Sequence, residues 1–219
     1  MSTRKKIRVV TETEHPLESP DYIDPDGCVN DNNSNPQFLS EIDEFVDYDE
    51  YSLLDLGCAG GQFVVDVYNK GFVSVGLEGG NETEILSRGA GSHNWQKFKN
   101  ECLFFADISQ PFDILDEDGN TVKFDFITGW DFFEHPDCSE IPGVIKNIKK
   151  HLKDDGMVLG TINPSEGWKH RCAKDKDWWD DTFTELGFAV DIYPFSCSPR
   201  PVGLGGQGYA ACFKLKTKR

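Results

Sequence analysis

The sequence predicts an α/β fold of three layers, in which helices cover both faces of a mostly parallel, seven-stranded sheet. Short apolar runs alternate with helical stretches along most of the 219 residues, and this alternation is typical of parallel strands joined by crossover helices. A glycine-rich turn follows the first strand, at the end of the sheet where α/β folds bind ligands. The last two apolar runs, 188–193 and 209–215, have no helical stretch between them, so they predict a C-terminal antiparallel hairpin.

Residues 1–35 predict an irregular N-terminal segment, because three prolines and the polar run at 30–35 favour turns over helices and strands. Residues 36–219 predict a single domain, since this length fits one hydrophobic core. Lids are commonly drawn from segments of low local stability. We therefore expect the N-terminal segment to order over a bound ligand as a lid.

The other elements follow from the spacing of apolar residues. Helical spacing over 38–46 predicts a helix that leads to a buried strand at 52–56. The crossover helix that begins near Phe63 is expected to end at Gly71, because glycine favours the C-terminal cap. Further strands are predicted at 72–78, 102–106, 124–128 and 157–162, a brief helix or loop at 83–90, and helices at 141–152 and 177–186.

A surface excursion is predicted between the third and fourth of these strands. The short runs 112–115 and 121–124 flank Asp118 and Gly119. An Asp-Gly pair between two such runs is a strong hairpin signal. We therefore expect these two runs to form a hairpin.

Charge and hydropathy exclude two classes of partner. The formal net charge of −16 opposes non-specific binding to polyphosphates, so a long nucleic acid is not an expected partner. No apolar run approaches the ~18 residues that cross a membrane, and the N-terminus lacks the apolar centre of a signal peptide. We expect a soluble, cytoplasmic protein, and the sequence leaves its oligomeric state open.

The seven cysteines are odd in number, widely spaced, and include no C-x-x-C pair. This pattern argues against both a disulfide framework and a zinc site. We expect reduced and mostly buried thiols.

The stretch YSLLDLGCAGG at 51–61 predicts a ligand-binding turn. Gly57, Gly60 and Gly61 can adopt positive φ and let a ligand approach the main chain closely. The helix that follows is expected to present free N–H groups to the crevice. A dinucleotide fingerprint would require a second glycine where Ala59 stands, so a nicotinamide enzyme is disfavoured.

Acidic residues end the next two predicted strands. Glu78 follows the second strand and Asp107 the third. The carboxyl ends of parallel strands lie at one edge of a sheet, where ligands bind. Because a carboxylate can accept from two hydroxyls, Glu78 suits a ribose diol.

The segment DLGCAGG at 55–61 resembles the first motif of the class I S-adenosylmethionine-dependent methyltransferases. The resemblance covers about 38–188 and implies a Rossmann-like fold with the seven strands and terminal hairpin predicted above. Within it, FDFITGWDFFEH at 124–135 is similar to the fourth-strand segment of many small-molecule methyltransferases. The resemblance implies S-adenosylmethionine as the cofactor. The residues implied to bind it are Asp55, Gly57, Cys58, Ala59, Gly60, Gly61, Glu78, Asp107, Ile108 and Trp130.

Four of these residues have specific roles in the resembling family. Glu78 is expected to accept from the ribose hydroxyls and Asp107 from the adenine amino group. The backbone N–H of Ile108 would serve the adenine ring. Trp130 would flank the sulfonium, where an aromatic face near a cation contributes roughly 0.5–2 kcal/mol.

Two motifs that are absent from this sequence narrow the range of methyl acceptors. Amino methyltransferases of adenine and cytosine carry Asp/Asn-Pro-Pro-aromatic after the fourth strand, where this chain has GWDF at 129–132. The Pro-Cys motif of base C5-methyltransferases is also missing. We expect transfer to an oxygen or nitrogen of a small, hydroxylated molecule such as a sugar. The alternative is a non-catalytic binding or regulatory protein with the same fold, which a turnover assay would distinguish.

Three residues are candidates for catalysis, namely His170, His135 and Glu134. Methyl transfer from a sulfonium depends mainly on positioning the nucleophile and taking its proton. A neutral imidazole suits this task because it titrates near the working pH. His135 and His170 are therefore the candidate bases.

A divalent metal is a further hypothesis for the same residues. Asp131, Glu134 and His135 stand at i, i+3 and i+4, so a helical turn would place them on one face. With His170 they would suit Mg²⁺, Mn²⁺ or Zn²⁺, which lowers the pKa of a bound hydroxyl. The set resembles the Glu-x-x-Glu-His segment and later histidine of the terminal-ribose methyltransferases of small RNAs and, in its first part, that of some quinone O-methyltransferases.

This chain departs from that pattern at two positions. Asp131 replaces the first glutamate, and Pro136 biases His135 away from helical geometry. The other interpretation is that Glu134 and His135 have structural roles, as Glu-His pairs without metal do in many relatives.

Overall fold

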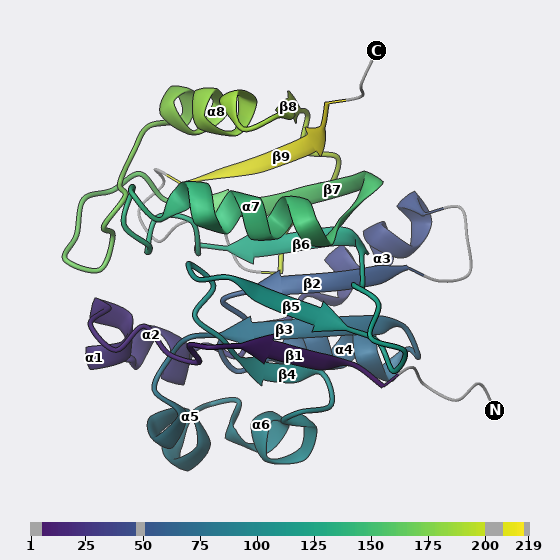
Figure 1. Cartoon of the computed structure of the whole chain (residues 1–219), viewed down its shortest axis with the longest axis vertical. Helices are drawn as coiled ribbons and strands as arrows, with labels where there is room; N and C mark the ends of the chain where they lie inside the picture. Colours follow the sequence, from purple (N-terminus) through teal and green to yellow (C-terminus); the bar gives the residue numbers. More distant parts are fainter. Residues whose placement is uncertain (1–5, 47–50, 200–207, 217–219) are drawn as a thin grey trace.

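A seven-stranded sheet forms the centre of the protein in this computed structural model, which describes residues 6–46, 51–199 and 208–216 (Figure 1). Its strands are β2 (Ser52–Leu56), β3 (Val73–Glu78), β4 (Leu103–Phe105), β6 (Phe124–Trp130), β7 (Leu152–Ile162), β8 (Phe188–Asp191) and β9 (Tyr209–Leu215). They lie in the order β4-β3-β2-β6-β7-β9-β8. The first five are parallel, whereas β9 is antiparallel to both β7 and β8. The predicted seven-stranded sheet and its terminal hairpin are confirmed.

The strand register brings the predicted ligand-binding positions to one edge of the sheet. Leu56 at the end of β2 lies opposite Leu77, and Glu78 at the end of β3 lies opposite Phe105 of β4. On the other side, Asp55 lies opposite Thr128 of β6. The turns that follow these strands therefore meet at the carboxyl edge.

Helices cover both faces, as the alternation of side chains along the strands predicts. They are α3 (Pro36–Phe45), α4 (Gln62–Asn69), α5 (Glu82–Arg88), α6 (Ser92–Phe98), α7 (Ile141–His151) and α8 (Lys176–Glu185). Leu54 of β2 packs in one core with α7 and α8, whereas its neighbour Leu53 packs in another with α3 and α4. A third cluster joins α5 and α6 to α4 and β4. These cores give the three layers.

The N-terminal segment is more regular than expected. Residues 1–5 lie outside the described part, and the rest forms β1 (Arg8–Thr11), α1 (Pro20–Ile23) and α2 (Asp26–Asn30). The strand β1 pairs antiparallel with β5 (Phe112–Leu115). Its sequence RVVT favours a strand, and β5 offers it an open row of backbone N–H and C=O groups.

This pairing corrects the predicted hairpin. The turn itself forms, because Gly119 has φ +84° and donates its N–H to Asp116 O. The run at 121–124 contributes a single bridge, between Thr121 and Leu115. The main partner of β5 is therefore β1, which is distant in sequence.

The helix α6 was not predicted. Its sequence SHNWQKF mixes polar and apolar residues over only seven positions, so the periodic signal is weak. Trp95 and Phe98 nevertheless bury their rings against α4 and β4.

Within the described ranges, no helix has the length and apolar character of a membrane span.

One cysteine pair contradicts the expectation of reduced thiols. Cys138 and Cys172 form a disulfide across 34 positions of sequence, and their Cα atoms are 4.8 Å apart. They lie in the loops that follow β6 and β7, which are neighbouring parallel strands. The other five cysteines are free thiols. Sequence spacing missed the pair because the sheet brings the two loops together.

Candidate functional site

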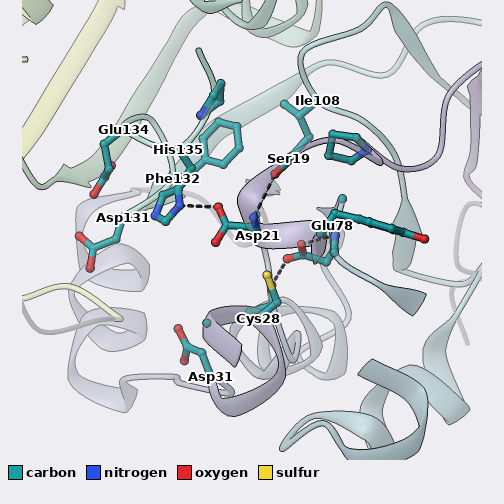
Figure 2. A pocket seen from close by; sticks show the side chains of 18 of the residues that line it. Ser19, Asp21, Cys28, Asp31, Glu78, Ile108, Asp131, Phe132, Glu134 and His135 are labelled. Atoms are coloured by element: carbon teal, nitrogen blue, oxygen red, sulfur yellow. Dashed lines mark hydrogen bonds and ion pairs between the residues drawn. The ribbon is translucent and has the colours of Figure 1, made fainter. Parts of the chain in front are cut away.

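A cavity of about 650 Å³ opens at the carboxyl edge of the sheet (Figure 2). Three parts of the chain line it: the strand ends with Gly57, Glu78 and Asp107, the loops with Glu134 and His170, and the N-terminal segment. The volume is typical of a site for a small molecule or cofactor. Six of the ten predicted cofactor residues line it, namely Gly57, Ala59, Glu78, Asp107, Ile108 and Trp130.

The Glu78 carboxylate lies between the glycine turn and the next strand. One oxygen accepts from Ala59 N and the other from Gly80 N, each at 2.7 Å. Burial raises the pKa of Glu78, and the two N–H donors oppose that rise. The Cys28 thiol donates a third hydrogen bond to this carboxylate. A carboxylate has about four acceptor positions, so one remains for a hydroxyl of a ligand.

The glycine turn has the predicted positive φ at two of its three glycines, and it lacks the predicted free amides. Gly57 and Gly61 have φ of +72° and +78°. Gly60 donates its N–H to Asp31 O at 2.9 Å, and Gln62 N at the start of α4 donates to Asn32 Oδ1 at 3.0 Å. A Cβ on Gly60 would lie 2.5 Å from that same Asn32 oxygen. The N-terminal segment therefore caps the helix, and the expectation of free N–H groups at these two positions is wrong.

Four predicted cofactor residues do not line the cavity. Cys58, Gly60 and Gly61 belong to the turn after β2 but are not among the lining residues. The Asp55 side chain is directed toward the neighbouring strand β6. Asp55 Oδ1 accepts from Thr128 Oγ1 at 2.6 Å. Burial raises the pKa of Asp55 to about 7. Asp55 thus joins β2 to β6.

Contacts with other side chains and with the backbone position both Asp107 and Trp130. Asp107 Oδ1 accepts from the backbone N and the hydroxyl of Ser109, at 3.0 and 2.7 Å. The Trp130 ring is buried and meets Phe38 of α3 edge to face, at 5.2 Å between centroids. Both residues keep fixed positions on the cavity wall.

The loop after β6 is not helical, which corrects the proposed alignment of Asp131, Glu134 and His135 on one helical face. Asp131 has φ +50°, and its Oδ1 accepts from Thr161 Oγ1 of β7 at 2.8 Å. Pro136 disfavours helical geometry in the preceding residue. The cluster that forms instead contains Glu134, His135 and His170, whose candidate ligand atoms lie within 4.8 Å of one another. Asp131 is not part of it.

Glu134 is fully buried, yet only one of its two carboxylate oxygens has a hydrogen-bond partner among the described residues. Its Oε1 accepts from Asn163 N at 3.0 Å. Among the residues that the structure describes, none forms a hydrogen bond with Glu134 Oε2. Burial raises the pKa of Glu134 to about 7, and the nearby His135 opposes the rise. A buried acceptor without a partner calls for a donor from a ligand.

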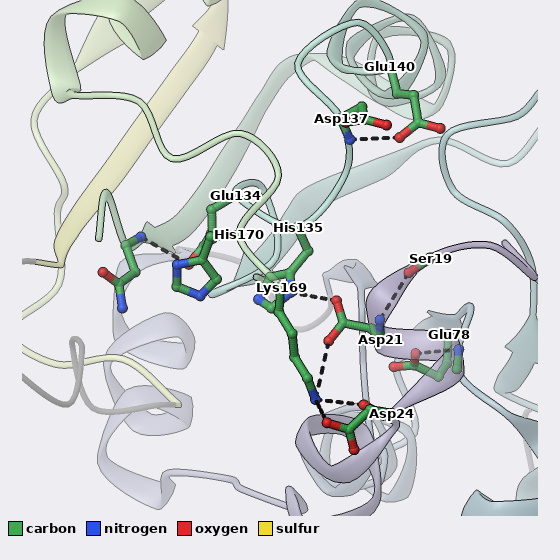
Figure 3. A network of polar contacts seen from close by, with 12 residues as sticks. Ser19, Asp21, Asp24, Glu78, Glu134, His135, Asp137, Glu140, Lys169 and His170 are labelled. Carbon is green, nitrogen blue, oxygen red and sulfur yellow. Dashed lines mark hydrogen bonds and ion pairs between the residues drawn. The ribbon is translucent and has the colours of Figure 1, made fainter. Parts of the chain in front are cut away.

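A different contact orients each of the two histidines, and Figure 3 shows that of His135 with Asp21. His135 Nδ1 lies 2.6 Å from Asp21 Oδ2 of α1. His170 Nδ1 lies 2.7 Å from Ser165 O. A carbonyl can only accept, so Nδ1 of His170 carries the proton and Nε2 of the neutral ring has the lone pair. The rings meet edge to face at 5.0 Å.

The N-terminal segment closes the cavity through α1. Lys169 Nζ donates to Asp24 O at 2.6 Å and forms ion pairs with the carboxylates of Asp24 and Asp21. Residues of this segment thus line the cavity, and a lid that orders over a bound ligand stays a prediction. Asp21 and Lys169 could not be predicted as neighbours of His135, because nothing local in the sequence relates them to it.

One comparison with known proteins relates this chain to a family by its sequence. A family model described as a methyltransferase domain matches residues 30–190. A search of curated proteins found no match.

Solved structures with the same fold include several methyltransferases. A TehB-like SAM-dependent methyltransferase from Corynebacterium glutamicum has a TM-score of 0.57 at 16% identity, over 81% of this chain and 86% of that one. PH0226 protein from Pyrococcus horikoshii gives the same score and identity over 94% and 97%. The magnesium protoporphyrin IX methyltransferase of Synechocystis, solved with bound SAH, has a TM-score of 0.56 at 10% identity over 91% and 96%. At these identities the likeness concerns the fold.

Proposed function

This chain belongs to the class I S-adenosylmethionine-dependent methyltransferases, and from that premise we propose that it methylates an oxygen or nitrogen of a small molecule held beside Glu134, His135 and His170. A small, hydroxylated acceptor such as a sugar is the first expectation. The observation that carries the proposal is the cavity itself, which joins the buried Glu78 to this cluster in one continuous space.

The residues on one side of the cavity fit the cofactor. Glu78 has one acceptor position left for a ribose hydroxyl, besides the three that Ala59, Gly80 and Cys28 occupy. Asp107 and Ile108 lie at the end of the neighbouring strand, where they suit the adenine ring. Trp130 offers an aromatic wall near the positive sulfur. S-adenosylmethionine supplies a methyl group on a positively charged sulfur, which leaves as a neutral thioether.

The residues on the other side fit proton transfer from an acceptor. His170 Nε2 has the lone pair, because Ser165 O fixes the proton on Nδ1. It can take the proton from an acceptor hydroxyl or amine as the nucleophile forms its bond. The segment around α1 lines the cavity, and its closure over bound reactants would keep water from them.

A divalent metal at the same cluster is the second candidate. One carboxylate and two imidazoles with ligand atoms within 4.8 Å of one another form a plausible partial coordination shell. Two nitrogen ligands favour Zn²⁺ over Mn²⁺ and Mg²⁺. Of the four residues predicted as ligands, Glu134, His135 and His170 fit this role and Asp131 does not.

The proposal is tested by product analysis. The protein is incubated with S-adenosylmethionine and a panel of small hydroxylated and aminated molecules, and mass spectrometry detects the added methyl group. His170→Ala should lower kcat by about 10²–10⁴ if His170 is the base. If S-adenosylhomocysteine binds but no panel member is methylated, the non-catalytic alternative is favoured. Full activity after dialysis against a chelator, with no metal bound, would exclude the metal candidate.

A further inference from the structure

We propose that the methyl acceptor is a cationic amine whose nitrogen binds the buried carboxylate of Glu134. This inference rests on the function proposed above and narrows it to one substrate class. Two independent observations support it, namely the charge of the cavity wall and the unsatisfied oxygen of Glu134.

The cavity wall is strongly acidic. Its carboxylates are Asp21, Asp26, Asp31, Glu78, Asp107, Asp131, Glu134 and Glu140. Arg171 is the one lysine or arginine among the described lining residues, and it forms an ion pair with Asp137. S-adenosylmethionine brings a sulfonium and an ammonium but also a carboxylate, so it offsets only part of this charge. An anionic acceptor would be repelled, whereas a cation would be attracted.

Most carboxylates at the acceptor end already have protein partners. Asp21 bonds to His135, and Asp131 accepts from Thr161. Glu140 Oε2 accepts from the backbone N of Asp137 at 2.7 Å. Glu134 differs from these residues, because its Oε2 is buried within the wall and has no hydrogen-bond partner among the described residues.

An ammonium group satisfies this oxygen better than a hydroxyl does. Both can donate a hydrogen bond to Oε2, but only the ammonium also compensates the negative charge of the buried carboxylate. Leaving such an oxygen without a donor costs more than an ordinary lost hydrogen bond. Figure 2 shows the Glu134 carboxylate beside that of Asp131, so a bound cation there would lie near two acidic groups.

The proposed methyl transfer needs only the amine, the cofactor and His170 to account for every proton and electron pair. The bound ammonium first gives one proton to His170 Nε2. The nitrogen lone pair then forms the N–C bond to the methyl group while the C–S bond breaks, and the electron pair of that bond stays on sulfur. The product leaves as a methylated ammonium, and His170 releases its proton to solvent.

The test compares amines, alcohols and carboxylates that share a carbon skeleton. The probes are 2-phenylethylamine, 2-phenylethanol and phenylacetate, together with 1,4-diaminobutane, 1,4-butanediol and succinate. Each is titrated into the full-length protein saturated with S-adenosylhomocysteine, by calorimetry and thermal shift. We expect at least one amine to bind at least tenfold more tightly than its alcohol, and the carboxylates not to bind.

The variants locate the effect. Glu134→Gln should reduce the amine advantage to less than about threefold, whereas Glu185→Gln, on the exposed side of α8, should leave it unchanged. If Glu134→Gln fails to fold, Glu134→Asp provides a second variant, because it keeps the charge but withdraws the carboxylate, and it should also reduce the amine advantage. Equal binding of amine and alcohol, an advantage that survives Glu134→Gln, or no amine binding would each overturn the proposal.

Failure of the proposed function has a different signature. If the protein does not bind S-adenosylhomocysteine at all, the cofactor assignment fails before any acceptor is added. If stoichiometric metal is bound and chelation abolishes acceptor binding, Glu134 Oε2 is a metal ligand, and the amine proposal is overturned while the methyltransferase function stands.

Discussion

Asp21 Oδ2 lies 2.6 Å from His135 Nδ1, although 114 positions of sequence separate the two residues. The contact joins α1, in the N-terminal segment, to the loop that carries the candidate acceptor residues. Lys169 reinforces it from the loop after β7 by pairing with Asp24. Three segments that are distant in sequence therefore meet over one cavity.

The first prediction concerns this closure. Amides at 20–36 should gain protection from hydrogen exchange when S-adenosylhomocysteine saturates the protein, because the segment then closes over a filled cavity. Lys169→Ala should raise the dissociation rate of the ligand about two- to fivefold, since a partly exposed ion pair contributes roughly 0.5–1 kcal/mol. Lys216→Ala, at the opposite end of the chain, is the control. No added protection at 20–36 would show that the segment is a fixed wall.

The second prediction concerns the Glu78 carboxylate. Glu78→Ala should weaken S-adenosylhomocysteine binding by roughly 1–3 kcal/mol in calorimetry, because it removes hydrogen bonds to a charged acceptor. Glu78→Gln keeps the shape of the side chain and should fall between wild type and Glu78→Ala. Glu185→Ala is the matched control on the surface. Unchanged affinity in Glu78→Ala would remove Glu78 from the cofactor site.

The third prediction is a pH dependence of stability caused by Asp55. Burial raises its pKa to about 7 in the folded protein, above the ordinary value of 3.8, so the folded form binds more protons between these two pH values. The free energy of unfolding should therefore fall as the pH rises from about 4 to about 7, by up to about 4 kcal/mol for this group. Asp55→Asn removes this pH-dependent contribution to stability, and the amide oxygen of the new side chain can still accept from Thr128 Oγ1.

Urea denaturation at pH 5 and pH 8 measures the difference. Wild type should lose more stability between the two values than Asp55→Asn does. Glu78 and Glu134 contribute in the same direction, because burial raises both of their pKa values. A wild-type slope that survives intact in Asp55→Asn would assign the pH dependence to those two residues instead.

The fourth prediction concerns the disulfide. Cys138→Ser should lower the free energy of unfolding by about 3–4 kcal/mol, as expected from loss of a cross-link that closes a loop across 34 positions. Cys197→Ser, which removes a free thiol, is the control. Reducing agent should destabilise wild type by a similar amount and leave Cys138→Ser unchanged. Two titratable thiols at positions 138 and 172 in the oxidised protein would contradict the bond.

The sequence predicted the features that depend on local pattern. The carboxyl edge of the sheet carries the glycine turn after β2, Glu78 at the end of β3 and Asp107 shortly after β4. These positions meet because parallel strands align their ends. Glu78 and Asp107 could therefore be assigned to one site without coordinates.

Features that depend on distant pairing could not be predicted. Asn32 caps α4 from 30 positions away, and nothing in the run of asparagines indicates which helix it meets. The metal hypothesis failed at Asp131 for a related reason, since its backbone adopts positive φ and its side chain turns to Thr161. Spacing along the chain describes one face only if the segment is a helix.

The wall of the cavity extends beyond the part of the chain that defines the family. The matched domain begins at residue 30, whereas Pro16, Ser19, Asp21 and Tyr22 already line the cavity. Substitutions in this short stretch can reshape the entrance without disturbing a single strand of the sheet. The segment before residue 30 is therefore a place where substrate preference can change while the shared domain keeps its fold.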